Sequence, residues 1–104
     1  MMIQITKDNF EAEVAQARDG VLLLFWSEHH SLSSTSLEKL EDLTAGTALQ
    51  LCTLHTNQQR DLAIQFELMG LPAAYLIRNG RIIYEWYAPQ PESRLLETVE
   101  QLGA

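Results

Sequence analysis

The chain has 104 residues, of which 46% are hydrophobic and 20% charged, and its formal net charge is −7. This size and composition fit one domain with a hydrophobic core. The negative charge argues against a nucleic-acid binder, which needs a basic face. The longest apolar run is too short to span a bilayer, and the N-terminus lacks the features of a signal peptide. We therefore expect a cytoplasmic protein that binds neither nucleic acid nor membrane.

The first half of the chain alternates short strands with helices. Residues 3–5 alternate apolar and polar side chains and predict a strand, and residues 10–17 show helical spacing before Asp19-Gly20. The run VLLLFW, residues 21–26, is apolar throughout, as expected of a strand buried on both faces. Hydroxyl side chains then cap a predicted helix over residues 33–45.

The second half continues this alternation and ends in a hairpin and a helix. A buried strand is predicted over residues 49–54 and a helix over residues 57–68. Two runs rich in β-branched and aromatic residues surround Asn79-Gly80, which is a strong hairpin signal. A terminal helix follows over residues 92–102. The order βαβαβαββα predicts an α/β fold with a central mixed sheet and helices on both faces.

The loop between the strand VLLLFW and the next helix holds the residues that could carry chemistry. Glu28, His29 and His30 lie in this loop, and His55 follows a later strand. Histidine and glutamate are residue types that bind zinc, but these four do not show the defined spacing of a structural zinc site. His30 and Ser33 stand three residues apart, so an enzyme in which the histidine activates the serine is an alternative. Hydroxyl residues at helix starts more often serve as caps. We expect no metal and no cofactor.

Three segments resemble thioredoxin in order and spacing. LLLFWSEHHSLS resembles the family's strand, W-C-G-P-C motif and helix; GLPAAYLI resembles the G-I-P segment with its cis proline; RNGRII resembles the last hairpin. The resemblance covers nearly the whole chain and implies a single thioredoxin-like domain over residues 1–104. It also implies that Pro72 follows a cis peptide bond and that Leu71 offers its backbone to an extended peptide.

The chain departs from the family where the chemistry lies. His30 stands at the position of the nucleophilic cysteine and Ser33 at that of the resolving cysteine. Leu24 replaces a buried aspartate that assists proton transfer in the family, and Ala88 stands near a family glycine. Cys52, the one cysteine, lies within a predicted buried strand, where a structural role is expected. Thiol–disulfide exchange needs two thiols, so we expect no such oxidoreductase activity.

From these departures we predict a redox-inactive binding module that acts as a chaperone, adaptor or assembly factor. It would hold an extended peptide or a protein partner at the cis-proline face and would be a monomer or a weak homodimer. The alternatives are an enzyme or metal site that uses His30 with Ser33, and a homodimeric interaction domain. The predicted binding residues are Trp26, His29, His30, Leu32, Leu71, Pro72 and Ala88.

Overall fold

The computed structural model describes residues 2–103 and confirms the predicted order of elements. In chain order these are β1 (Ile3–Gln4), η1 (Glu11–Ala15), β2 (Val21–Trp26), α1 (Ser34–Ala45), β3 (Gln50–His55), α2 (Arg60–Gln65), β4 (Ala73–Arg78), β5 (Arg81–Tyr87) and α3 (Glu92–Gly103). The element η1 is a short π-helix, and α1 to α3 are α-helices. Within residues 2–103, no helix is both long and apolar enough to cross a membrane.

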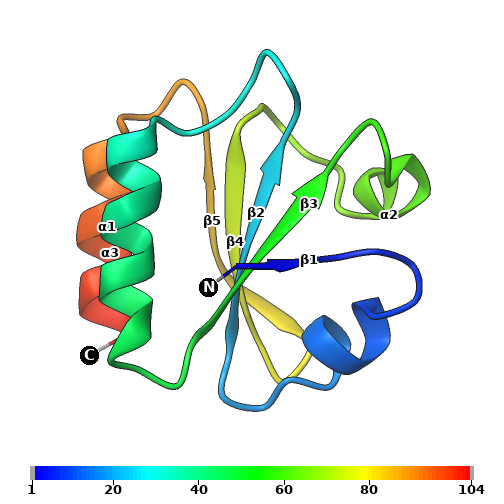
Figure 1. Cartoon of the computed structure of the whole chain (residues 1–104), viewed down its shortest axis with the longest axis horizontal. Helices are drawn as coiled ribbons and strands as arrows, with labels where there is room; N and C mark the ends of the chain where they lie inside the picture. The colour runs from blue at the N-terminus through cyan, green and yellow to red at the C-terminus, as the bar shows by residue number, and fades with distance from the viewer. Residues whose placement is uncertain (1, 104) are drawn as a thin grey trace.

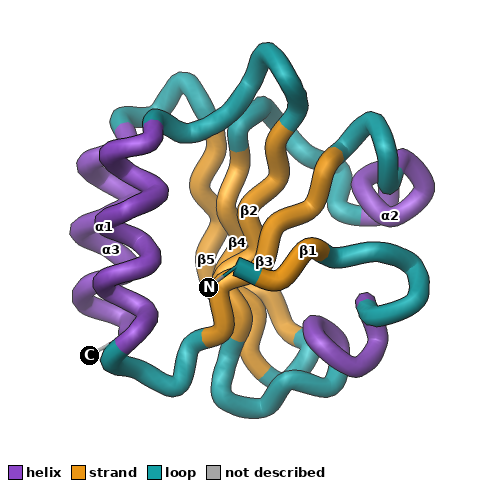
Figure 2. Tube along the Cα trace, in the orientation of Figure 1, coloured by secondary structure: helices purple, strands orange, loops and turns teal. Residues whose placement is uncertain are grey.

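The five strands form one mixed sheet in the order β1-β3-β2-β4-β5 (Figure 2). β3 pairs in parallel with both β1 and β2. β4 runs antiparallel to β2, and β5 runs antiparallel to β4. The parallel pairs follow from the helical crossovers, and the antiparallel edge follows from the tight hairpin.

Helices cover both faces of this sheet. Figure 1 shows α1 and α3 side by side against one face, with η1 and α2 on the other side of the sheet. Each face has its own apolar cluster, and β2 contributes alternate residues to both: Leu22 and Leu24 to one, and Leu23 and Phe25 to the other. β2 is therefore the centre of the domain, which explains why VLLLFW shows no polar alternation.

The hairpin between β4 and β5 has the predicted turn, and β5 carries an irregularity. Asn79 and Gly80 both have positive φ, 54° and 76°, as a type I′ turn requires. Leu76 pairs with Tyr84 while Ile77 pairs with Ile82, so one residue of β5 is bulged out of the ladder. β5 is also an edge strand of the sheet.

Helix α2 is shorter than the sequence predicted, covering Arg60–Gln65 instead of residues 57–68. On its N-terminal side, backbone N–H groups of the preceding turn bond to His55: that of Gln59 to its carbonyl oxygen and that of Gln58 to its ring. On its C-terminal side, Glu67 has a φ of 50°, which stops a right-handed helix.

Candidate functional site

The sheet register brings three loops to one end of the molecule. Phe25 pairs with Ala73, and Ala73 pairs with Tyr87, so the segments that flank these residues are neighbours. They are the loop after β2, the loop before β4 and the loop after β5. The backbone N–H of Ala88 donates a 3.0 Å hydrogen bond to the carbonyl oxygen of Pro72, which joins the last two.

The Leu71–Pro72 peptide bond is cis, and so is the Ala88–Pro89 bond beside it. Gly70 precedes this region and packs tightly against the loop after β5. A Cβ atom added at Gly70 would run into the carbonyl oxygen of Ala88. The two loops can therefore approach this closely only because position 70 has no side chain.

The loop after β2 begins with a tight turn that positions His30. Ser27 and His30 exchange two backbone hydrogen bonds, of 3.0 and 3.1 Å. The Ser27 hydroxyl also lies 3.2 Å from Nδ1 of the His30 ring. Ser27 is buried and His30 is exposed, so the turn presents the imidazole to solvent with one nitrogen already engaged.

Glu28 points from this turn to the end of β3. Its carboxylate lies 2.7 Å from Nε2 of His55 and accepts a 3.3 Å hydrogen bond from the side-chain amide of Asn57. The backbone N–H of Gln58 donates to Nδ1 of His55, so that nitrogen is an acceptor and the proton resides on Nε2. Hydrogen bonds from its own backbone N–H and from His55 lower the pKa of Glu28.

The histidines and acidic residues do not converge on a common point. Within residues 2–103, no group of three or more His, Cys, Asp or Glu side chains has the arrangement to hold a metal ion. His55 does reach the loop after β2, but it contacts Glu28 rather than His29 or His30.

Ser33 caps helix α1 and also contacts α3. Its hydroxyl oxygen accepts a 3.2 Å hydrogen bond from the backbone N–H of Ser36, the arrangement expected of an N-cap residue. The same hydroxyl donates a 2.8 Å hydrogen bond to the carboxylate of Glu92, and Ser36 donates its own hydroxyl to that carboxylate. These bonds lower the pKa of Glu92, and the bond from Ser36 makes the largest contribution.

Ser33, which the resemblance aligned with the family's resolving cysteine, is thus part of a helix cap. Glu92 lies at the start of α3, and its charge is also favourable at the N-terminus of α1 because orphan N–H groups point there. Ser33 is not paired with His30: its hydroxyl is engaged by Ser36 and Glu92. The structure does not bring the two together as a nucleophile and its base.

Cys52 lies in the middle of the sheet, and its thiol is not in the reactive thiolate form. It is fully buried in β3, where it pairs with Ile3 on one side and Leu23 on the other. Burial, with a smaller contribution from Glu13, raises the pKa of its thiol to about 12. Since the thiolate is the nucleophile, this cysteine does not supply one near neutral pH.

An open groove runs along the outer side of the cis-proline loop. It is lined by His30, Thr56, Leu68, Met69, Gly70, Leu71, Ala88 and Pro89. Met69 in this groove is 73% exposed.

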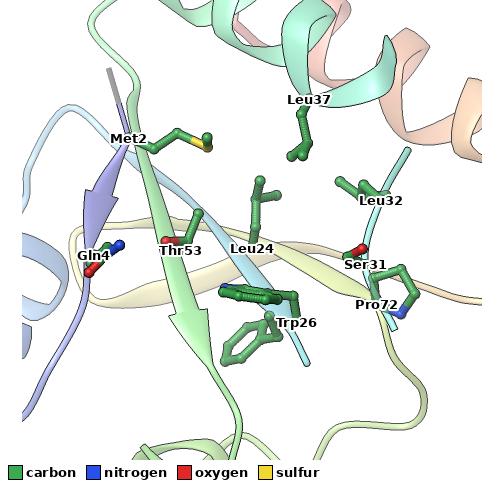
Figure 3. A pocket seen from close by; sticks show the side chains of 10 residues that line it. Met2, Gln4, Leu24, Trp26, Ser31, Leu32, Leu37, Thr53 and Pro72 are labelled. Carbon is green, nitrogen blue, oxygen red and sulfur yellow. The ribbon is translucent and has the colours of Figure 1, made fainter. Parts of the chain in front are cut away.

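The predicted binding residues divide between two places. His30, Leu71 and Ala88 line the outer groove. Trp26, Leu32 and Pro72 instead line a separate cavity on the inner side of the loop, and Leu32 is only 6% exposed (Figure 3). His29 is exposed on the turn and lines neither.

Several residues of the site were not predicted from the sequence, among them Thr56, Leu68, Met69 and Gly70 of the groove. Ser27 and Glu92 act through hydrogen bonds to His30 and Ser33, and Pro89 forms part of the groove. Ser27 immediately follows the buried strand, which was a usable signal. The contact of Glu92 with Ser33 spans 59 positions and has no local pattern.

Comparison with known proteins places the chain in a family. The family profile described as Thioredoxin matches residues 1–101. The chain belongs to the thioredoxin family. It is 33% identical over 86 residues to a thioredoxin of Acetoanaerobium sticklandii, with 81% of this chain and 82% of the relative covered. It is 29% identical over 87 residues to a thioredoxin of Peptoclostridium acidaminophilum, with 82% of this chain and 79% of the relative covered.

A solved structure supports the same fold. The crystal structure of the Malassezia sympodialis thioredoxin Mala s 13 matches with a TM-score of 0.83 and covers 100% of this chain and 92% of that one. The sequence identity is 20%, so this match bears on the fold alone. The predicted thioredoxin-like α/β fold is confirmed.

The relatives overturn the function predicted from the sequence. A redox-inactive chaperone, adaptor or assembly factor was expected, but the similar proteins are thioredoxins, which points to a thioredoxin redox function. The alternatives of an enzyme or metal site built on His30 and Ser33, and of a homodimeric interaction domain, are set aside with it. The chain nevertheless carries one cysteine, Cys52.

Proposed function

We propose that this thioredoxin-family protein promotes thiol–disulfide exchange on a bound protein partner that supplies the reacting sulfur atoms. The chain contributes a binding groove and a base. The observation that carries the proposal is that the imidazole of His30, at the position of the family nucleophile, lines the same groove as Leu71. A cytoplasmic location, where thiols are kept reduced, suits this activity.

The groove offers main-chain pairing to an extended segment. Leu71 lies just before β4, and within residues 2–103 its backbone N–H and C=O take part in no hydrogen bond. An extended partner can therefore pair with it as an added strand. Met69 and Leu68 supply apolar contact beside it. The net charge of −7 favours a partner segment that is neutral or basic.

His30 is suited to take the proton of a bound thiol. Its Nδ1 faces the hydroxyl of Ser27, while within the described chain its Nε2 has no hydrogen-bond partner. Imidazole is the side chain that ordinarily changes protonation near neutral pH, so it can both accept and return a proton. Two backbone hydrogen bonds with Ser27 fix the main chain of His30, and the contact of its Nδ1 with the Ser27 hydroxyl orients the ring.

The exchange step balances without any sulfur from this chain. A cysteine thiol of the bound segment gives its proton to His30, and the resulting thiolate attacks a disulfide. One S–S bond forms as another breaks, and the leaving thiolate takes the proton from His30. The attacking sulfur is oxidised and the leaving sulfur is reduced, so electrons balance. On this proposal the chain performs no exchange through cysteines of its own.

The test is the rate at which a peptide with one cysteine reacts with the neutral disulfide 2,2′-dithiodipyridine. We expect the wild type to accelerate the release of thiopyridone by about tenfold or more, in line with general-base catalysis. His30→Ala should remove the acceleration, while Ser31→Ala, its exposed neighbour, should keep it. Leu71→Asp should raise the peptide concentration needed for half-maximal rate.

Two outcomes would reject the proposal. One is a wild-type rate equal to that of peptide and disulfide alone. The other is loss of the acceleration in Cys52→Ala, since that would assign the reacting sulfur to this chain. Circular dichroism of each variant establishes that a lost rate is not a lost fold.

A further inference from the structure

A cavity of about 410 Å³ lies between α1 and the sheet, beside the loop after β2. Figure 3 shows Leu24, Trp26, Leu32 and Leu37 around it, with Met2 of the N-terminal segment on the opposite side. The outer groove contains His30, Leu71 and Ala88, none of which lines this cavity. The cavity is therefore a second site, separate from the one proposed for exchange.

The cavity combines an apolar lining with a few free polar groups. Gln4, Ser31 and Thr53 are among its lining residues. Within residues 2–103 the side chains of these three residues, and the indole N–H of Trp26, make no hydrogen bond. Apolar pockets with a small number of unpaired polar groups are typical sites for small molecules, and this volume lies in their range.

The charges around the cavity limit what can bind. None of its lining residues is charged. An adjoining hollow shares Gln4, Trp26 and Thr53 with it and contains Glu28, whose pKa is lowered so that it is anionic at neutral pH. The protein as a whole carries a net charge of −7. An anionic ligand would meet repulsion and would lose its hydration without gaining a positively charged partner among the lining residues.

We propose that this cavity binds a small uncharged molecule with an aromatic or branched aliphatic body and one hydrogen-bonding group. The body replaces solvent against Leu24, Leu32 and Leu37. The polar group meets Gln4, Thr53 or the indole N–H of Trp26, which are among the lining residues. This site is independent of the proposed exchange activity and uses neither His30 nor Leu71.

The test is a titration with p-cresol followed by ¹H–¹⁵N NMR. We expect saturable shifts with a Kd of about 1 mM, largest at Gln4, Thr53 and the indole N–H of Trp26. The indole N–H of Trp86 serves as an internal control, because it is buried and bonded to the carbonyl oxygen of Pro91. The anion 4-methylbenzoate, with the same ring, should bind about tenfold more weakly.

Two variants of α1 sharpen the test. Leu37→Trp places a larger side chain at the cavity and should abolish the shifts, whereas Leu43→Trp, half-buried on the same helix and outside the cavity, should retain them. Shifts that do not saturate, that centre elsewhere, or that persist in Leu37→Trp overturn the proposal. Equal or tighter binding of 4-methylbenzoate overturns the assignment of an uncharged ligand. The wild-type shift map decides the question even where a variant does not fold.

Discussion

The hydroxyl of Ser33 donates a hydrogen bond of 2.8 Å to the carboxylate of Glu92, so the N-termini of two helices distant in sequence share one acid. Ser36 donates to the same carboxylate oxygen, and Ser33 caps α1 through the N–H of Ser36. Ser33 is thereby part of the contact between α1 and α3.

Glu92→Gln should lower the free energy of unfolding at neutral pH by about 1 kcal/mol, through loss of a charged acceptor at a helix N-terminus. The pKa of Glu92 is below its ordinary value of 4.5, chiefly because of the bond from Ser36. The stabilisation is therefore full above pH 4.5 and is lost as the pH falls through the lower, folded-state pKa. Urea titrations of both proteins across this range measure the difference. A difference that grows towards acid would contradict this role.

Gly70→Ala should destabilise the protein by about 1–3 kcal/mol, because the added Cβ would meet the carbonyl oxygen of Ala88. The matched control is Gly46→Ala at the end of α1, where an added Cβ meets nothing within 4 Å. That change should leave stability unaltered or raise it by up to about 1 kcal/mol. Thermal unfolding of the two variants compares them, and equal effects would show that the approach of the two loops is not tight.

Cys52 should resist modification in the native protein. Its thiol is fully buried and its pKa is raised to about 12, mainly by burial. Iodoacetamide at pH 8 should therefore label the native chain only at the rate of unfolding, while the denatured chain reacts at once. Mass spectrometry measures the labelled fraction over time. Rapid labelling of the native protein would place the thiol outside the core.

The neutral form of the His55 ring should carry its proton on Nε2. Its Nδ1 accepts from the backbone N–H of Gln58 at 3.1 Å, and its Nε2 faces Glu28 at 2.7 Å. Long-range ¹H–¹⁵N NMR distinguishes the two tautomers. Glu28→Gln should preserve the Nε2–H form, because the glutamine oxygen is still an acceptor. Asn57→Ala serves as the control, because Asn57 contacts the other carboxylate oxygen of Glu28 and not His55. Detection of the Nδ1–H form would contradict the hydrogen bonds described here.

The parts of the fold that local patterns determine were predictable. Asn79-Gly80 adopts the turn expected of that dipeptide, and VLLLFW is a strand buried on both faces. Both depend on backbone preferences or on a simple hydrophobic run. The length of helix α2 was overestimated. The pattern of apolar residues does not reveal that His55 binds the backbone of the preceding turn, or that Glu67 ends the helix with a positive φ.

Motif positions in three segments led to the prediction of His30, Leu71 and Ala88 as binding residues. The structure places all three along one groove, and their role in binding stays a prediction. Leu32 was assigned to the same surface, but it lies in the segment just before α1 and packs in the apolar cluster that contains Leu22 and Leu24. The contact between Ser33 and Glu92 depends on how α1 and α3 pack, and no pattern within either segment contains that information.

The irregular pairing of β5 has a consequence for the protein in concentrated solution. Ile82 and Ile83 are each nearly half exposed on this strand, and such apolar residues invite a second molecule to extend the sheet. Ile83 is the residue of β5 that is bulged out of the ladder, opposite Leu76 and Ile77 of β4. This bulge interrupts the regular row of main-chain donors and acceptors that fibril growth would require. Deleting Ile83 would restore that regular row, and aggregation on storage is the expected cost.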